Sequence, residues 1–330
     1  MEQRPADMPV QPAPQTAPEI AARPPVLRRI NEAHRELDYL LFNLDRVPDA
    51  QSRLLALAGK LMAAVEDGPD IALACILHNQ DEGSYAVRHC IDTAVVAMLV
   101  ARALDKLPNQ ILTIVAGALT MNIGMLHKHE QLQTRLNAIS QDELAAIHAH
   151  PEVGADILRR AGITDEEWLD CVLLHHENED GSGYPYGWTG ERIPVTVKII
   201  ALADRYCARV SSRSYRRSLL PIEALRDILL ADQHLVDPML TACFIRVVGM
   251  YPTGAVVRLA SGEIGVVSGK GSDSTAPAVQ VLVGADGVLL GTPVMRDTGN
   301  AGYGVREMLS SEQAGVRFRM WQVWGEDARP

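Results

Sequence analysis

The chain has 330 residues, and 47% of them are hydrophobic, enough for a large buried core and more than one domain. Its net charge of −10 excludes a broad nucleic-acid-binding face, which needs an excess of lysine and arginine. The five cysteines are scattered and never form a Cys-x-x-Cys pair, a pattern typical of reduced thiols in a cytosolic core. We find no secretory signal pattern, and the longest apolar run, residues 111–126, is too short to span a bilayer. These features predict a cytoplasmic protein without a membrane anchor.

The beginning of the chain predicts a tail followed by two helices. Residues 1–25 are rich in proline and poor in apolar side chains, which is typical of disorder. Residues 26–69 carry leucines at helical spacing on both sides of Pro48, and so predict two amphipathic helices. The simple interpretation is that these helices pack on the next domain. A contact with a protein partner or a second copy is the alternative.

Residues 70–249 predict an almost continuous series of helices. Pro151 is expected to interrupt one of them, because proline lacks the N–H that a helix interior needs. Thr164 and Glu167 have the spacing of a capping box, and residues 181–194 predict a loop. The expected helices cover residues 84–104, 111–119, 143–150, 165–176, 195–209 and 221–230.

The spacing of apolar residues changes in residues 250–330. Short alternating apolar segments separated by glycines predict strands rather than helices. We therefore expect a mainly α protein with a small C-terminal β module, for which a structural cap is the simplest role. The expected strands cover residues 255–259, 263–267, 279–283 and 316–323.

Several potential metal ligands lie on successive helices of the 70–249 region. Any one of them alone is more often an ordinary core or surface residue, but together they can converge on one pocket of a helical bundle. Imidazoles combined with a carboxylate suit iron, manganese or zinc. The candidate ligands are His89, His150, His175, His176 and Asp204.

Two adjacent histidines at a helix end are followed by an acidic, glycine-rich turn in residues 175–185, His-His-Glu-Asn-Glu-Asp-Gly-Ser-Gly-Tyr-Pro. This segment resembles the signature of the HD-GYP family, bacterial hydrolases of cyclic di-GMP, and the likeness extends over about residues 70–250. It implies an HD-type helical bundle with a dinuclear or trinuclear iron or manganese centre that produces linear pGpG or GMP. The resemblance assigns metal binding to the five candidate ligands above. It makes Gly183, Tyr184 and Pro185 the name-giving triplet beside the substrate.

A cluster of arginines in this acidic protein offers a site for phosphate. Residues 212–216 resemble the family's Arg-x-Tyr-(Lys/Arg) stretch, which implies that Arg213 and Arg216 hold the phosphates of the ligand. Guanidinium groups suit phosphodiester oxygens because they donate paired hydrogen bonds. A solvated helix face is the alternative interpretation of this cluster.

One part of the family pattern is missing. Where the family has His-Asp-x-Gly-Lys, this chain has Met121-Asn122-Ile123-Gly124-Met125. An asparagine at 122 offers one neutral oxygen in place of a bridging carboxylate, and a methionine thioether is too soft for iron or manganese. Tyr85 stands where trinuclear members have a glutamate, so a third metal is not expected. His127 and His129 could substitute as ligands, or lie in an exposed loop.

These departures leave three hypotheses and no assigned catalytic residue. The first is a degenerate HD-GYP protein that binds cyclic di-GMP or a protein partner and holds at most one iron or manganese ion, on His150, His175 and His176. The second is a working phosphodiesterase with one metal or a rearranged ligand set. The third is a hydrolase of another nucleotide, which the intact Gly-Tyr-Pro triplet disfavours. Homodimerisation stays open.

Overall fold

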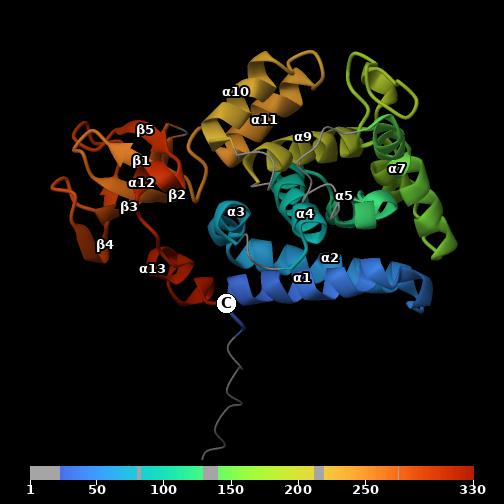
Figure 1. Cartoon of the computed structure of the whole chain (residues 1–330), viewed down its shortest axis with the longest axis horizontal. Helices are drawn as coiled ribbons and strands as arrows, with labels where there is room; N and C mark the ends of the chain where they lie inside the picture. The colour runs from blue at the N-terminus through green and yellow to red at the C-terminus, as the bar shows by residue number, and fades with distance from the viewer. Residues whose placement is uncertain (1–22, 80–82, 129–139, 212–218, 274) are drawn as a thin grey trace, which may run out of the picture.

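The computed structural model describes residues 23–79, 83–128, 140–211, 219–273 and 275–330. Most of the expected tail, His129, and the stretch with Arg213 and Arg216 lie outside the described residues. The fold is mainly helical with a small antiparallel sheet near the C-terminus, as the sequence predicts (Figure 1).

The helices share one hydrophobic core, to which the N-terminal pair contributes as fully as the later ones. Several begin with a proline in the first turn, where the missing N–H has no partner to lose. In Figure 1 the N-terminal pair (blue) lies along one side of the central helices. The main helices are α1 (Val26–Phe42), α2 (Ala50–Asp67), α3 (Pro69–His78), α4 (Tyr85–Ala103), α5 (Pro108–Thr120), α7 (Gln141–Arg160), α8 (Glu166–Leu174), α9 (Val195–Val210), α10 (Pro221–Leu230) and α11 (Pro238–Val248).

The helical stretch that contains α5 is longer than the apolar run 111–126 identified in the sequence. The helical stretch Pro108–Lys128 has 21 residues, and by length and composition alone it could cross a membrane. However, 72% of its apolar window is buried inside the bundle, as in the core helix of a globular protein. Just after α5 the chain forms a short 3₁₀ turn, η2 (Ile123–Met125).

Pro151 does not end its helix, contrary to expectation, since α7 continues to Arg160. A proline leaves the carbonyl four residues earlier without its N–H donor. Here that carbonyl belongs to Ile147, and Nδ1 of His150 lies 2.6 Å from it as a substitute donor. The helix therefore continues, and the histidine ring is held in one orientation.

The predicted capping box at Thr164 and Glu167 is also wrong. The N-cap of α8 is Asp165, whose carboxylate accepts a hydrogen bond from the backbone N–H of Trp168 at 3.1 Å. Thr164 instead donates its backbone N–H to Gln51 of α2 at 2.7 Å. Thr164 therefore makes a tertiary contact with α2 and does not cap α8, although its spacing from Glu167 fits a capping box.

The C-terminal sheet has the strand order β4-β3-β2-β1-β5, with every neighbouring pair antiparallel. The strand predicted at 316–323 is wrong, because residues 315–319 are irregular and α13 (Met320–Trp324) follows. Val316 and Phe318 pack against buried residues of the sheet instead of joining it as a strand. The short η4 (Glu326–Ala328) then returns to α1, near the point marked C in Figure 1. The strands are β1 (Val256–Leu259), β2 (Ile264–Asp273), β3 (Ala276–Val283), β4 (Leu289–Asp297) and β5 (Val305–Leu309).

Candidate metal centre

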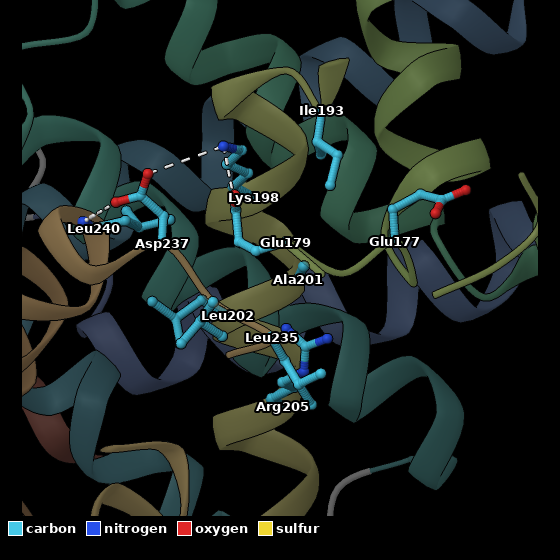
Figure 2. Close-up of a pocket in the computed structure, with 11 residues that line it drawn as sticks. Glu177, Glu179, Ile193, Lys198, Ala201, Leu202, Arg205, Leu235, Asp237 and Leu240 are labelled. Carbon is cyan, nitrogen blue, oxygen red and sulfur yellow. Dashed lines mark hydrogen bonds and ion pairs between the residues drawn. The ribbon is translucent and has the colours of Figure 1, made fainter. Parts of the chain in front are cut away.

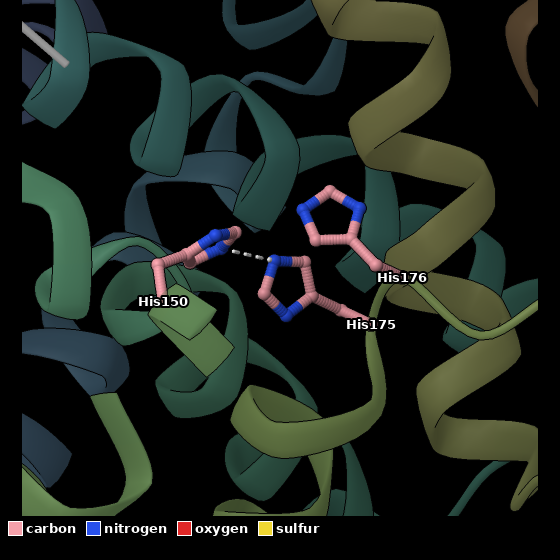
Figure 3. Close-up of side chains that lie close together, drawn as sticks. All are labelled: His150, His175 and His176. Atoms are coloured by element: carbon pink, nitrogen blue, oxygen red, sulfur yellow. Dashed lines mark hydrogen bonds between the residues drawn. The ribbon is translucent and has the colours of Figure 1, made fainter. Parts of the chain in front are cut away.

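Three histidines from two neighbouring helices converge on one point. His150 comes from the middle of α7, His175 is the C-cap of α8, and His176 follows it. One ring nitrogen from each lies within 4.8 Å of the others, and no other such group occurs among the described residues (Figure 3). Residues 25 positions apart in the chain thus form a ready set of nitrogen ligands.

The backbone fixes which nitrogen of two rings faces the centre. Nδ1 of His150 lies 2.6 Å from the carbonyl of Ile147, and Nδ1 of His175 lies 2.7 Å from the carbonyl of Val172. A carbonyl can only accept a hydrogen bond, so both Nδ1 atoms carry the proton and both Nε2 atoms present lone pairs. Such a bond to the non-ligating nitrogen is the usual support of a metal-binding histidine.

The two Nε2 atoms lie only 3.2 Å apart. Two lone pairs at that distance repel unless a cation sits beside them. A proton is a poor candidate, because burial and the neighbouring His175 lower the pKa of His150 to about 3. Burial also lowers the pKa of His175 and His176. A neutral, buried triad of nitrogens therefore fits a metal ion.

The other half of the expected centre is arranged differently. His89 on α4 and Asp204 on α9 contact each other directly, with Nε2 of His89 2.6 Å from Oδ1 of Asp204. Burial by itself would raise the pKa of Asp204, but the hydrogen bond and charge of His89 hold it well below its usual range. These two side chains satisfy one another.

The residues that replace the family's His-Asp motif are all buried. Asn122 is 5% exposed and lies against the thiol of Cys90. Met121 and Met125 are 0% and 8% exposed and offer no charge. Gly124 is retained because a Cβ there would come within 2.1 Å of the carbonyl oxygen of His150. The motif thus keeps its packing role and loses its polar ligands.

The Gly-Tyr-Pro triplet lies directly against the histidines. The ring of Tyr184 stacks on His176 on one side, with centroids 4.7 Å apart, and on His148 on the other, at 4.4 Å. Gly183 permits this approach, because a Cβ would meet the Asn178 nitrogen, the Glu177 Cα and the His176 oxygen at 2.5 Å each. The Tyr184–Pro185 peptide bond is cis. The loop therefore forms one wall of the candidate metal centre.

Two contacts with α9 hold this loop to the bundle, and Glu177 ties the loop together internally. Glu177, 2% exposed, accepts hydrogen bonds from the backbone N–H groups of Tyr186 at 2.7 Å and Trp188 at 2.8 Å. Arg205 donates a hydrogen bond to Asn178, and Lys198 forms an ion pair of 2.7 Å with Glu179. Figure 2 shows that Lys198 and Arg205 extend from α9 on this side and line a small pocket.

Sequence reasoning missed the residues that position the site. His148 lies two residues before a candidate ligand, and only its tertiary contact with Tyr184 distinguishes it. Of the downstream histidines that could have served as substitute ligands, His127 is exposed and packs against Phe42 of α1 with ring centroids 5.2 Å apart. The acidic run 177–180 was read only as part of a turn, although two of its members anchor the loop to α9.

The fold has counterparts in known proteins. The family model described as HD domain matches residues 16–240, and the chain belongs to the HD domain family. Its resemblance to HD-GYP proteins is confirmed. A solved structure of Bd1817, an HDG"Y"P protein from Bdellovibrio bacteriovorus, matches with a TM-score of 0.57 and 16% identity over 68% of this chain and 73% of that one. That likeness concerns the fold alone.

Two relatives with similar sequences are named as cyclic di-GMP phosphodiesterases. The chain is 30% identical to cyclic di-GMP phosphodiesterase PA4108 of Pseudomonas aeruginosa, over 74% of this chain and 59% of that protein. It is 26% identical to the cyclic di-GMP phosphodiesterase response regulator RpfG of Xanthomonas campestris pv. campestris, over 59% of this chain and 53% of that protein. The chain thus spans little more than half the length of these relatives.

Proposed function

We propose that this protein is a cyclic di-GMP signalling protein of the HD-GYP type whose phosphodiesterase activity is weak or absent. In this proposal its centre holds at most one iron or manganese ion, on His150, His175 and His176. The observation that carries it is the buried stretch of Met121, Asn122 and Met125 at the place of the family's motif, which leaves the expected ligands His89 and Asp204 without a bridging aspartate beside them.

The chemical basis of the proposal is that a single metal ion cannot do all that a bridged pair of ions does. A metal ion acidifies its bound water, and a bridged pair in addition clamps both oxygens of an in-line displacement. On this chain the imidazoles would hold the ion, and the loop around Tyr184 would exclude water from one side. Asn122 is a neutral amide and contributes no bridging charge.

Ligand binding is assigned to the loop and the arginine stretch. In the proposal Gly183, Tyr184 and Pro185 form a wall of the cyclic di-GMP pocket, and Arg213 and Arg216 hold its phosphates. Replacing both arginines by alanine should abolish binding in a calorimetric titration, because each charged contact contributes roughly 1.5–3 kcal/mol. Arg226→Ala, an exposed arginine on α10, is the matched control. Unchanged affinity in the double variant would place the ligand elsewhere.

Two measurements separate the degenerate protein from a working enzyme. Elemental analysis of protein purified anaerobically should give at most one ion per chain, and two tightly bound ions would refute the proposal. The triple change Met121→His, Asn122→Asp and Met125→Lys should then raise metal occupancy and hydrolysis together, with pGpG formed before GMP. Asn122→Asp alone should do less.

An active phosphodiesterase is the second candidate. It is favoured by the intact nitrogen triad, whose ligand atoms lie within 4.8 Å of one another. A wild-type protein that hydrolyses cyclic di-GMP as fast as the triple variant would establish it. We further propose a cytoplasmic location, a structural role for residues 250–330, and a contact with a protein partner or with a second copy of the chain.

A further inference from the structure

A second cavity lies where the helical bundle meets the C-terminal sheet. Its volume is about 270 Å³, close to the lower end of the roughly 300–1,000 Å³ typical of small-molecule sites. The bundle contributes Leu73 of α3 and Arg246 of α11, and the sheet contributes Lys270 of β2. Tyr251, in the connection between them, and Pro277 of β3 complete the apolar wall.

The two cations of this cavity form no ion pair with a carboxylate among the described residues. The hydrogen bond that the structure gives Arg246 runs to the Cys243 sulfur at 3.7 Å, and no ion pair of Lys270 occurs within the described part of the chain. The neighbouring acid, Asp70, accepts a hydrogen bond from Thr253 of the same cavity at 3.1 Å, and its charge also interacts with that of Lys270. Arg246 and Lys270 are both exposed and outnumber the single acid beside them, so this face of a protein with net charge −10 keeps a positive charge that favours an anionic ligand.

Glycines fix the position of Lys270. A Cβ at Gly269 would lie 2.8 Å from Oδ2 of Asp70, and one at Gly271 would lie 1.8 Å from the carbonyl oxygen of Ala276. The register of β2 against β3 also shifts here, from Gly269 opposite Ala278 to Asp273 opposite Ala276. The lysine therefore sits in an irregular stretch that only glycine neighbours allow, and it borders the cavity from the sheet side.

We propose that this cavity binds a small phosphate monoester with a flat apolar body, the chemistry of a nucleoside monophosphate. Arg246 and Lys270 hold the phosphate, since a guanidinium and an ammonium suit its oxygens. The ring of Tyr251 and the side chains of Leu73 and Pro277 contact the flat body. Because both the bundle and the sheet form the walls, the bound ligand fixes one against the other. This site is separate from the histidine centre and goes beyond the proposed function.

Calorimetric titration of the full chain with GMP, AMP, guanosine and inorganic phosphate tests the proposal. We expect GMP or AMP to bind more tightly than guanosine or phosphate alone, since the cavity offers both cations and an apolar wall. Arg246→Gln and Lys270→Gln should each weaken nucleotide binding by about tenfold or more. Arg226→Gln, an exposed arginine outside the cavity, should leave it unchanged.

The outcomes separate this site from the histidine centre. Binding of GMP that survives both cavity substitutions would place the nucleotide elsewhere and overturn the proposal, as would no binding of GMP or AMP at millimolar concentration. Thermal unfolding of each variant checks that it is folded, and nucleotide should raise the unfolding temperature of the wild type and not of the double variant. Metal content, which tests the proposed function, does not enter these measurements.

Discussion

Replacing Gly183 by alanine tests whether the Gly-Tyr-Pro loop supports the metal centre. The added Cβ would lie 2.5 Å from three backbone atoms, whereas ordinary contacts begin at 3.4 Å, so the loop must open by about 1 Å. Overpacking of this kind costs about 1–3 kcal/mol of the free energy of unfolding. One of the three atoms is the carbonyl oxygen of His176, so the shift also moves a candidate ligand and its stacking partner Tyr184.

The assay combines thermal unfolding with metal titration of the variant and the wild type. Gly59→Ala is the matched control, because Gly59 is exposed inside α2 and nothing lies within 4 Å of its added Cβ. That control should stabilise the helix by about 0.5–1 kcal/mol and leave metal affinity unchanged. Gly183→Ala should lower both the unfolding temperature and the metal affinity. If it binds metal as tightly as the wild type, the loop does not position His176, and this account of the site is wrong.

Three further predictions concern buried groups. Pro151→Ala should stabilise α7 but weaken metal binding by about tenfold. The new N–H would compete with His150 for the carbonyl of Ile147, which orients the histidine ring. Equal affinity of the variant and the wild type in a metal titration would contradict this. Burial raises the pKa of Asp92 to about 7, above the roughly 3.9 of an exposed aspartate, so stability should fall as pH rises from about 4 to 7. Asp92→Asn should remove that slope in denaturant unfolding, and an unchanged slope would argue against it. Chelation of bound metal should lower the unfolding temperature of the wild type, whereas a variant with His150 changed to alanine should not respond.

The sequence alone predicts much of the helical architecture because apolar spacing is a local signal. The helix that begins at Pro221 ends at Leu230, as expected from a first-turn proline and a run of apolar residues. The pattern of residues 175–185 also identifies the family, and the change at Met121-Asn122 is visible without coordinates. The loss of the two expected ligands at positions 121 and 122 can therefore be recognised from the residue types alone.

Other features depend on contacts between distant segments, which no local pattern contains. The helix continues through Pro151 because a histidine ring supplies the missing donor, and the sequence does not predict β4 because its side chains are largely exposed. Residues 316–323 alternate like a strand, yet they pack against the sheet instead of pairing with it. Likewise, the sequence names His150 and His175 as candidates, but only the packing of α7 on α8 brings their nitrogens to 3.2 Å and turns both lone pairs toward one point.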